Sequence, residues 1–486
     1  MPLPHAPAAP RASGKSVSPV MAGAWLALAW SVLAFGGVYP WAYWPLFALA
    51  AAVGMVGILQ SRRDVFSANR RVAIAILAVA VPILVQLVPV PRDVLLAITP
   101  QTDEMLRQVD LAYATDPGPH PISLDPIATV RALAGFVCIG LFVLGLSSRL
   151  SRQSAAGLVV GTIVLGVAVS LVAIVQRSVG SGLIYGFWKP LEGGVPYGPF
   201  VNRNHFAGWM VMVVSLSLGE LCRRTASLGT ARLPDWRARI LWLSSAEASK
   251  AILLAGAVAC MSVALVLTLS RSGIAAFAVA LVVMGLFVRR HDGSARSKFA
   301  LGAYLSILVL IGIVAAGAGA IVQRFAAANW TELGDRRTAW TIALDMARDF
   351  PVTGTGINTF GYLSPVYTKN ALPVHYGEAH NDYLQLAAEG GLLVGIPIAI
   401  ALWLIVINVR QRFRDVDRSG YWVRAGAATG VAAMAFQEIV DFSLQVPANA
   451  LCFAMLLALA IHAPRPRSAV SERRDSYGPP RWPSRR

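Results

Sequence analysis

The feature that most constrains this chain of 486 residues is a succession of long apolar runs with few charges inside them. A helix that crosses a membrane needs about 20 mostly apolar residues, because the hydrocarbon core of a bilayer is about 30 Å thick. The runs that reach or approach this length predict an all-α polytopic membrane protein with about 12 transmembrane helices. They are 20–38, 42–59, 72–90, 129–148, 155–176, 205–222, 251–269, 273–288, 299–322, 383–408, 425–440 and 447–462.

The composition excludes a soluble multidomain protein of this length. Hydrophobic residues make up 56% of the chain and charged residues only 14%, whereas globular proteins carry nearer to about 25% charge. The net charge of +17 comes from basic residues that lie between apolar runs rather than in one soluble patch, so we expect no nucleic-acid partner. The four cysteines lack metal-ligand spacing, and we expect neither a disulfide framework nor a zinc site.

The basic residues also orient the predicted helices, because cytoplasmic loops carry an excess of Lys and Arg. Placing both termini in the cytoplasm puts 30 of the 42 Lys and Arg residues on the inner side. The N-terminal apolar run is too long for the core of a signal peptide, so we interpret it as an uncleaved first helix. The predicted organisation is a cytoplasmic tail (1–19), N-terminal helices with a first external loop (20–190), a second transmembrane region with an external loop at 323–380 (191–462), and a disordered basic cytoplasmic tail (463–486).

Three predicted external segments are long enough to fold: 91–128, 177–204 and 323–380. The first is acidic and rich in proline, and we interpret it as an irregular surface loop without chemistry. The second ends in Asn202-Arg203-Asn204-His205 at the start of an apolar run. With Asn204 as the predicted N-cap, the outward helix N-terminus would suit an anionic ligand. The alternative is a polar interfacial cap with a snorkelling arginine.

A very short external hairpin carries a single arginine, in the sequence Leu269-Ser270-Arg271-Ser272-Gly273. An ionisable group at or slightly inside the membrane boundary is a functional-site hypothesis by default, and Gly273 would let another backbone or a substrate approach. The alternative is that Arg271 snorkels to lipid phosphates.

The third external segment contains a moderately amphipathic pattern over 334–349, which predicts a helix with Arg336 and Trp340 one turn apart. Pro351 ends this helix, and a flexible turn is expected over 354–360. The Gly-x-Gly in that turn is not followed by Gly-Lys-Ser/Thr, so it is not a phosphate-binding P-loop.

His380 lies just before the apolar run 383–408, and a helical arrangement would place it on one face with Tyr383. A histidine is a natural proton acceptor near neutral pH, although a structural role for His380 is the alternative. Glu389 lies in the first turns of the run, where a carboxylate needs a partner or an aqueous cavity. Without a His-Glu-x-x-His pattern we expect no metal.

Gln437, Glu438 and Asp441 approach the outer end of the eleventh run. Their carboxylates are expected to pair with the external arginines. The alternative is a proton or ion path, as in a transporter.

Taken in order, these motifs resemble the superfamily of O-antigen ligases and O-antigen polymerases, which are bacterial envelope glycan transferases. The resemblance covers about residues 200–400, together with the many-helix topology. It rests on Asn202-Arg203-Asn204-His205-Phe206-Ala207-Gly208, Ser270-Arg271-Ser272-Gly273, Arg336 with Trp340, Pro351-x-x-Gly354-x-Gly356, His380-Asn381-Asp382-Tyr383-Leu384-Gln385 and Glu389-Gly390-Gly391.

The resemblance implies an inverting glycosyltransferase without metal or cofactor, in the bacterial inner membrane, acting on its periplasmic face. The donor would be a glycan on undecaprenyl pyrophosphate. The acceptor hydroxyl would lie on lipid A–core, on another lipid-linked glycan or, in related enzymes, on a protein. On this hypothesis His380 is the general base. Arginine suits the pyrophosphate, which Arg203, Arg271 and, more weakly, Arg336 would bind. Asn202, Asn204, His205 and Tyr383 would orient the substrate, and Glu378 or Asp382 would tune His380.

Two other classes compete with this interpretation. A transporter or lipid-linked glycan flippase predicts ionisable residues in the middle of the membrane and an internal repeat. The middles of the apolar runs are nearly uncharged, the polar residues gather in the external segments, and the sequence shows no internal repeat. A structural membrane scaffold would leave the external Arg and His residues without a role.

Overall fold

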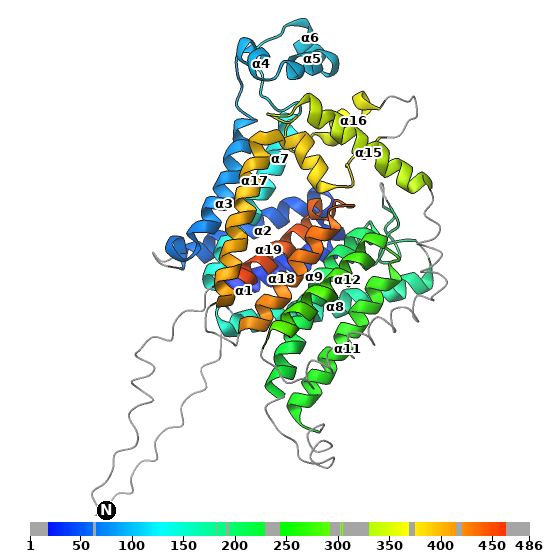
Figure 1. Cartoon of the computed structure of the whole chain (residues 1–486). Helices are drawn as coiled ribbons and strands as arrows, with labels where there is room; N and C mark the ends of the chain where they lie inside the picture. The colour runs from blue at the N-terminus through cyan, green and yellow to red at the C-terminus, as the bar shows by residue number, and fades with distance from the viewer. Residues whose placement is uncertain are drawn as a thin grey trace, which may run out of the picture.

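The computed structural model describes residues 18–61, 65–180, 182–190, 194–228, 244–291, 302, 304, 330–368, 375–414 and 420–462. Within these ranges the regular elements are helices, with isolated β-bridges but no strands (Figure 1). Eleven of the twelve predicted runs coincide with helices, and the remaining run, 299–322, lies outside the described residues except for 302 and 304, as do most of both tails. The all-helical class is confirmed.

Seven of the described helices are long and apolar enough to cross a membrane. The number that cross a membrane beyond these seven stays a prediction. The seven are α2 (Pro40–Leu59), α7 (Pro126–Arg149), α8 (Arg152–Val179), α9 (Arg203–Leu228), α11 (Ala246–Leu267), α12 (Arg271–Arg290) and α17 (Asp382–Arg414). They are joined by the shorter apolar helices α1 (Pro19–Leu33) and α19 (Pro447–Ile461), and by α3 (Val65–Val85) and α18 (Tyr421–Gln437).

Helix α9 is the centre of the bundle. Its apolar window is entirely buried, and it packs against α8, α11, α12, α18 and α19. Small residues allow the closest approach: a Cβ atom on Gly219 would lie 2.4 Å from the carbonyl oxygen of Trp422. The side chains at the two ends of α9 are therefore fixed by surrounding helices rather than by lipid.

One end of the bundle carries a separate folded layer, which we call the cap (Figure 1). It consists of α4 (Arg92–Ile98), α5 (Pro100–Val109), α6 (Leu111–Thr115), α15 (Trp330–Asp349) and α16 (Phe360–Tyr367). Its own apolar core joins the two halves of the chain, because Leu106 and Tyr113 of the first half pack in one cluster with Ile342 and Phe360 of the second.

The prediction that 91–128 is an irregular loop is therefore wrong. Asp110 caps α6 by accepting the N–H groups of Ala112 and Tyr113. The buried Asp103 carboxylate accepts hydrogen bonds from Arg92 at 2.8 Å and from the Tyr113 hydroxyl at 2.7 Å. The hydrogen bond from Arg92 holds the pKa of Asp103 at about 2. The acidic residues of this segment, which suggested a solvated loop, instead form the hydrogen bonds that hold its helices.

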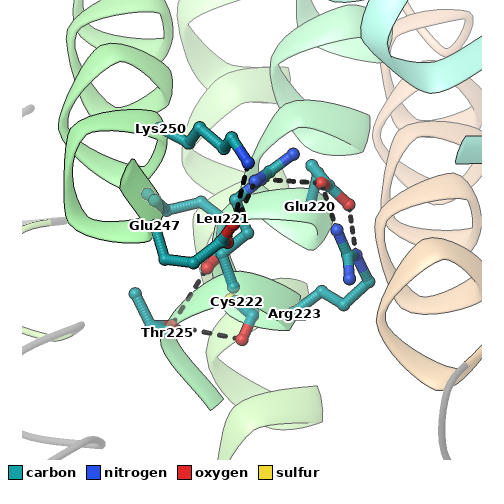
Figure 2. A network of polar contacts seen from close by, with 8 residues as sticks. Glu220, Leu221, Cys222, Arg223, Thr225, Glu247 and Lys250 are labelled. Atoms are coloured by element: carbon teal, nitrogen blue, oxygen red, sulfur yellow. Dashed lines mark hydrogen bonds and ion pairs between the residues drawn. The ribbon is translucent and has the colours of Figure 1, made fainter. Parts of the chain in front are cut away.

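The opposite end of the bundle is basic, and Figure 2 shows its main polar network. Glu220, near the end of α9, is buried and forms salt bridges with Arg223 at 2.6 Å and with Arg224 at 2.8 Å. Glu247 on the neighbouring α11 accepts Lys250 at 2.8 Å. A longer ion pair, from Arg224 of α9 to Glu247 at 3.9 Å, ties α9 to α11 at the end away from the cap.

Candidate functional site

Four segments meet at the end of the bundle that faces the cap. Three of them were predicted as site segments from the sequence: the entry of α9 (202–205), the turn between α11 and α12 (269–273), and the loop before α17 (378–382), while only Gln437, Glu438 and Asp441 were singled out in the fourth. The fourth, residues 437–449 between α18 and the first turn of α19, contacts all three and joins them.

The entry of α9 is a capped helix N-terminus, but the capping residue is Asn202 rather than the predicted Asn204. The Oδ1 atom of Asn202 accepts the backbone N–H of Asn204 at 2.8 Å, because α9 begins two residues earlier than expected, at Arg203. The carbonyl of Asn204 accepts the side-chain amide of Gln437 at 3.2 Å. The carbonyl of His205 accepts the amide of Asn449 at 3.0 Å.

The α11–α12 turn is tight and strained. Leu269 has a φ of 52°, a conformation that a branched side chain rarely adopts. Ser270 then caps α12 through the N–H of Gly273 at 3.2 Å. A Cβ atom on Gly273 would lie 2.4 Å from Ala207 of α9, so glycine permits the close helix approach expected from the sequence. Arg271 is thereby fixed as the first residue of α12.

The joining segment brings two histidines to one aromatic ring. The ring centroid of Phe442 lies 4.8 Å from that of His205 and 4.8 Å from that of His380, both edge-to-face. The neighbouring Asp441 accepts the hydroxyl of Ser272 at 2.9 Å. His205 is buried, and neither of its ring nitrogens has a hydrogen-bond partner among the residues that the structure describes. Phe442 was not singled out from the sequence, where an isolated aromatic after an apolar run carries no signal.

The sequence predicted that His380 shares a helical face with Tyr383. This prediction is wrong, because His380 precedes α17. The helix begins at Asp382, and Asn381 caps it by accepting the N–H groups of Tyr383 and Leu384, each at 3.0 Å. Such a cap requires a change of backbone direction, and His380 takes a φ of 54°. Strained non-glycine residues of this kind cluster at functional sites.

Helix α15 approaches the same loop. The indole N–H of Trp340 donates to the carbonyl of His380 at 3.4 Å. Arg336 lies one turn before Trp340 on α15, as predicted. The helix expected over 334–349 is thus confirmed, and it contributes to the surroundings of His380.

An amide network holds the carboxylates beside His380. The Gln385 side-chain amide donates to Glu378 at 2.7 Å and to Glu389 at 3.1 Å, while its oxygen accepts the N–H of Ala379 at 2.9 Å. Burial raises the pKa of Glu378 to about 8. Glu378 is therefore mostly neutral at pH 7.

Two further predicted residues are tied to their surroundings. The carboxylate of Asp382 accepts the amide of Gln445 at 2.7 Å. The hydroxyl of Tyr383 donates to the carbonyl of Ala435 on α18 at 2.7 Å, so a substrate would meet the ring or a lone pair of Tyr383.

Helix α17 is broken at Gly391, which has φ 53° and ψ −157°. The break leaves backbone groups of α17 free to bind residues 351–357. We call residues 351–357 the strap. Thr355 N–H donates to the carbonyl of Ala388 at 3.1 Å, and Leu393 N–H donates to that of Val352 at 2.8 Å. One glycine of the Pro-x-x-Gly-x-Gly motif and one of the Glu-Gly-Gly motif are explained together. A Cβ atom on Gly354 would lie 2.1 Å from the carbonyl oxygen of Glu389, and one on Gly391 would lie 2.5 Å from the backbone nitrogen of Gly354.

The prediction of a flexible turn over 354–360 is therefore wrong. Residues 353–356 are buried. The Glu389 carboxylate accepts the N–H groups of Asn358 at 2.8 Å and Phe360 at 2.9 Å, where a negative charge is favoured at the N-terminus of α16. Glu389 is a structural carboxylate that joins α17 to the cap.

The structure thus gathers the segments that carry Asn202, Arg203, Asn204, His205, Arg271, Glu378, His380, Asp382 and Tyr383, with Arg336 on the adjacent α15. Sequence analysis missed Phe442, Gln445 and Asn449, which are single polar or aromatic residues near apolar runs. Within the described ranges, no group of three or more His, Cys, Asp or Glu side chains is arranged to hold a metal ion.

Comparison with known proteins gives one family. Residues 256–399 match the family model for O-antigen ligase. The matched region contains Arg271, Arg336, His380 and the broken part of α17, whereas the entry of α9 and the joining segment lie outside it. No curated protein matches the chain. Over residues 256–399 the chain is thus similar to the O-antigen ligase family, whose members are membrane glycosyltransferases of the ligase and polymerase type.

Proposed function

We propose that this protein transfers a glycan from undecaprenyl pyrophosphate to an acceptor hydroxyl at the cap-facing end of the bundle, on the periplasmic side of the bacterial inner membrane. The observation that carries the proposal is the meeting of His380, His205 and the Ser272–Asp441 pair around Phe442. These residues come from four segments that lie far apart in the sequence. Both termini would lie in the cytoplasm.

The reaction needs one displacement. The acceptor oxygen attacks the anomeric carbon, the bond from that carbon to the pyrophosphate oxygen breaks, and the hydroxyl proton passes to His380. The electron pair leaves with the pyrophosphate, and a single displacement inverts the configuration at the anomeric carbon. A positioned histidine typically contributes about 10²- to 10⁴-fold to such a proton transfer.

Arg203 and Arg271 would bind the pyrophosphate. Each is the first residue of a helix, α9 or α12, so the positive end of that helix adds to the charge of its guanidinium group. Donors fixed before the reaction stabilise the charge that develops on the leaving group. Arg336 on α15 would be a weaker third ligand from the side of the cap.

Other residues would hold the reacting groups in place. Asn202, Asn204, His205 and Tyr383 would orient the substrates. Asp382 and the mostly neutral Glu378 would set the electrostatic surroundings of His380. This mechanism uses no metal or cofactor.

The matching experiment compares two arginines of one helix. Arg271→Ala should abolish transfer from a lipid-linked glycan, assayed with purified protein by mass spectrometry of the product. Arg290→Ala, at the other end of α12, should leave transfer unchanged. Full activity of the Arg271 variant would remove its pyrophosphate-binding role. Offering lipid A–core, a lipid-linked glycan or a peptide hydroxyl as acceptor distinguishes a ligase, a polymerase and a protein glycosyltransferase.

A further inference from the structure

Gln86, the residue after α3, is fully buried and lies in the first half of the chain, far outside the region that matches the family. Its side-chain amide donates to the carbonyl of Thr353 at 2.8 Å and to that of Glu389 at 2.9 Å. Its side-chain oxygen accepts the N–H of Ile357 at 3.3 Å. One amide therefore binds the strap at two points and α17 at the residue before its Gly-Gly break.

These partners are backbone groups at the site where α17 is interrupted. Carbonyls freed by a helix break and buried away from water need donors. Gln86 supplies one N–H donor to the strap and one to α17. Its own backbone carbonyl accepts the N–H of Ser123 at 2.9 Å. The first half of the chain thus fixes where the strap and the first turns of α17 lie.

The position of α17 in turn determines the position of His380. Two residues lead from the break to the loop: Glu389 binds Gln385, and Gln385 binds the N–H of Ala379, the residue before His380. The same first turns of α17 carry Asp382. A shift at the break would therefore move the imidazole relative to Phe442 and the entry of α9.

We propose that Gln86 is a positioning residue of the transferase site, through which the N-terminal half of the chain sets the placement of His380. This inference rests on the proposed function. It gives the N-terminal helices and first external loop (20–190) a part in placing the base, although none of their side chains is proposed to contact the substrate.

The test uses the full-length protein with two substitutions and a lipid-linked glycan as donor. Gln86→Leu keeps the volume but removes all three hydrogen bonds, and we expect kcat per folded molecule to fall about tenfold to a hundredfold, since small displacements are costly in a transferase site. The KM for the donor should change less than about threefold, because the proposed arginine ligands stay on α9 and α12. Gln411→Leu, an exposed glutamine at the other end of α17, is the control.

Gln86→Glu distinguishes positioning from simple stabilisation. A carboxylate cannot donate to the two carbonyls, whereas the protonated acid can donate to one of them. The kcat of this variant relative to the wild type should therefore rise as the pH is lowered. A variant Gln86→Leu with wild-type kcat per folded molecule and only a lower Tm would overturn the inference.

Hydrogen exchange gives a readout that does not depend on activity. In Gln86→Leu, the amides of residues 378–390 should exchange faster than in the wild type, while those of α12 should be unchanged. Unchanged exchange in 378–390 would also overturn the inference. A wild-type protein without transferase activity would instead refute the proposed function, so the two failures are distinguishable.

Discussion

The two ends of the helical bundle hold their buried carboxylates in different ways. At the basic end, Glu220 is held by the guanidinium groups of Arg223 and Arg224. At the cap-facing end, Glu389 is held by backbone N–H groups and by the neutral amide of Gln385. Neutral donors satisfy a carboxylate without a guanidinium group. The comparison shows that the position of Glu389 depends on where the backbone of residues 358–360 lies, whereas that of Glu220 depends on two long basic side chains.

The cap-facing end depends on backbone geometry, and disrupting that geometry should lower the free energy of unfolding the most. A side chain at Gly391 would be in a nearly glycine-only conformation, with its Cβ atom 2.5 Å from the backbone nitrogen of Gly354. Gly391→Ala should therefore lower the free energy of unfolding by about 3 kcal/mol or more, measured by unfolding in mixed micelles. Gly395→Ala, on the same helix with open space around it, should be neutral or stabilising by up to about 1 kcal/mol. Equal effects of the two substitutions would contradict the role given to the break.

The basic end depends on ion pairs, and neutralising its central carboxylate should have a smaller effect. Glu220→Gln leaves two partly exposed arginines without their partner and should cost about 1–3 kcal/mol of unfolding free energy. The substitution Glu247→Gln, at an exposed residue, should lower the free energy of unfolding by less than about 1 kcal/mol. Neither change should alter transfer per folded molecule, because the network lies away from the cap. A selective loss of kcat in Glu220→Gln would show that the ends are coupled.

The cap itself should respond to acid through Asp103. The pKa of this carboxyl is lowered to about 2 by Arg92, so the folded state favours the charged form. The stabilisation is present above the ordinary pKa near 4 and is lost as the pH falls through about 2. Proteolysis of residues 91–116 should accelerate over this range, and Asp103→Asn should weaken the dependence on pH. Asp116→Asn, an exposed cap carboxyl, should behave as the wild type.

The contrast between the ends also explains what could be predicted from sequence. The helices of the bundle are predictable because the length of an apolar run reports directly on a spanning helix. The helix over 334–349 in the cap was predicted, but the buried strap and the break in α17 were missed, because they depend on backbone hydrogen bonds between distant residues such as Thr355 and Ala388. Such bonds do not depend on the identity of the side chains. The glycines at 354 and 391 were visible, but only their mutual contact shows why they are needed.

The candidate site shows the same limit. Arg271 and His380 stood out because charged groups near a membrane boundary are costly. Gln86 and Phe442 did not stand out, since one amide or one aromatic ring is ordinary at the end of an apolar run. Their roles depend on the partners that the fold brings to them.

The most direct test of the account is the rate of glycan transfer by two histidine variants of the purified protein. His380→Gln should reduce kcat by about 10²-fold or more at unchanged folding, while His375→Gln, an exposed histidine in the loop before it, should keep the wild-type rate. A His380 variant that transfers glycan within twofold of the wild type would contradict the assignment of this imidazole as the base.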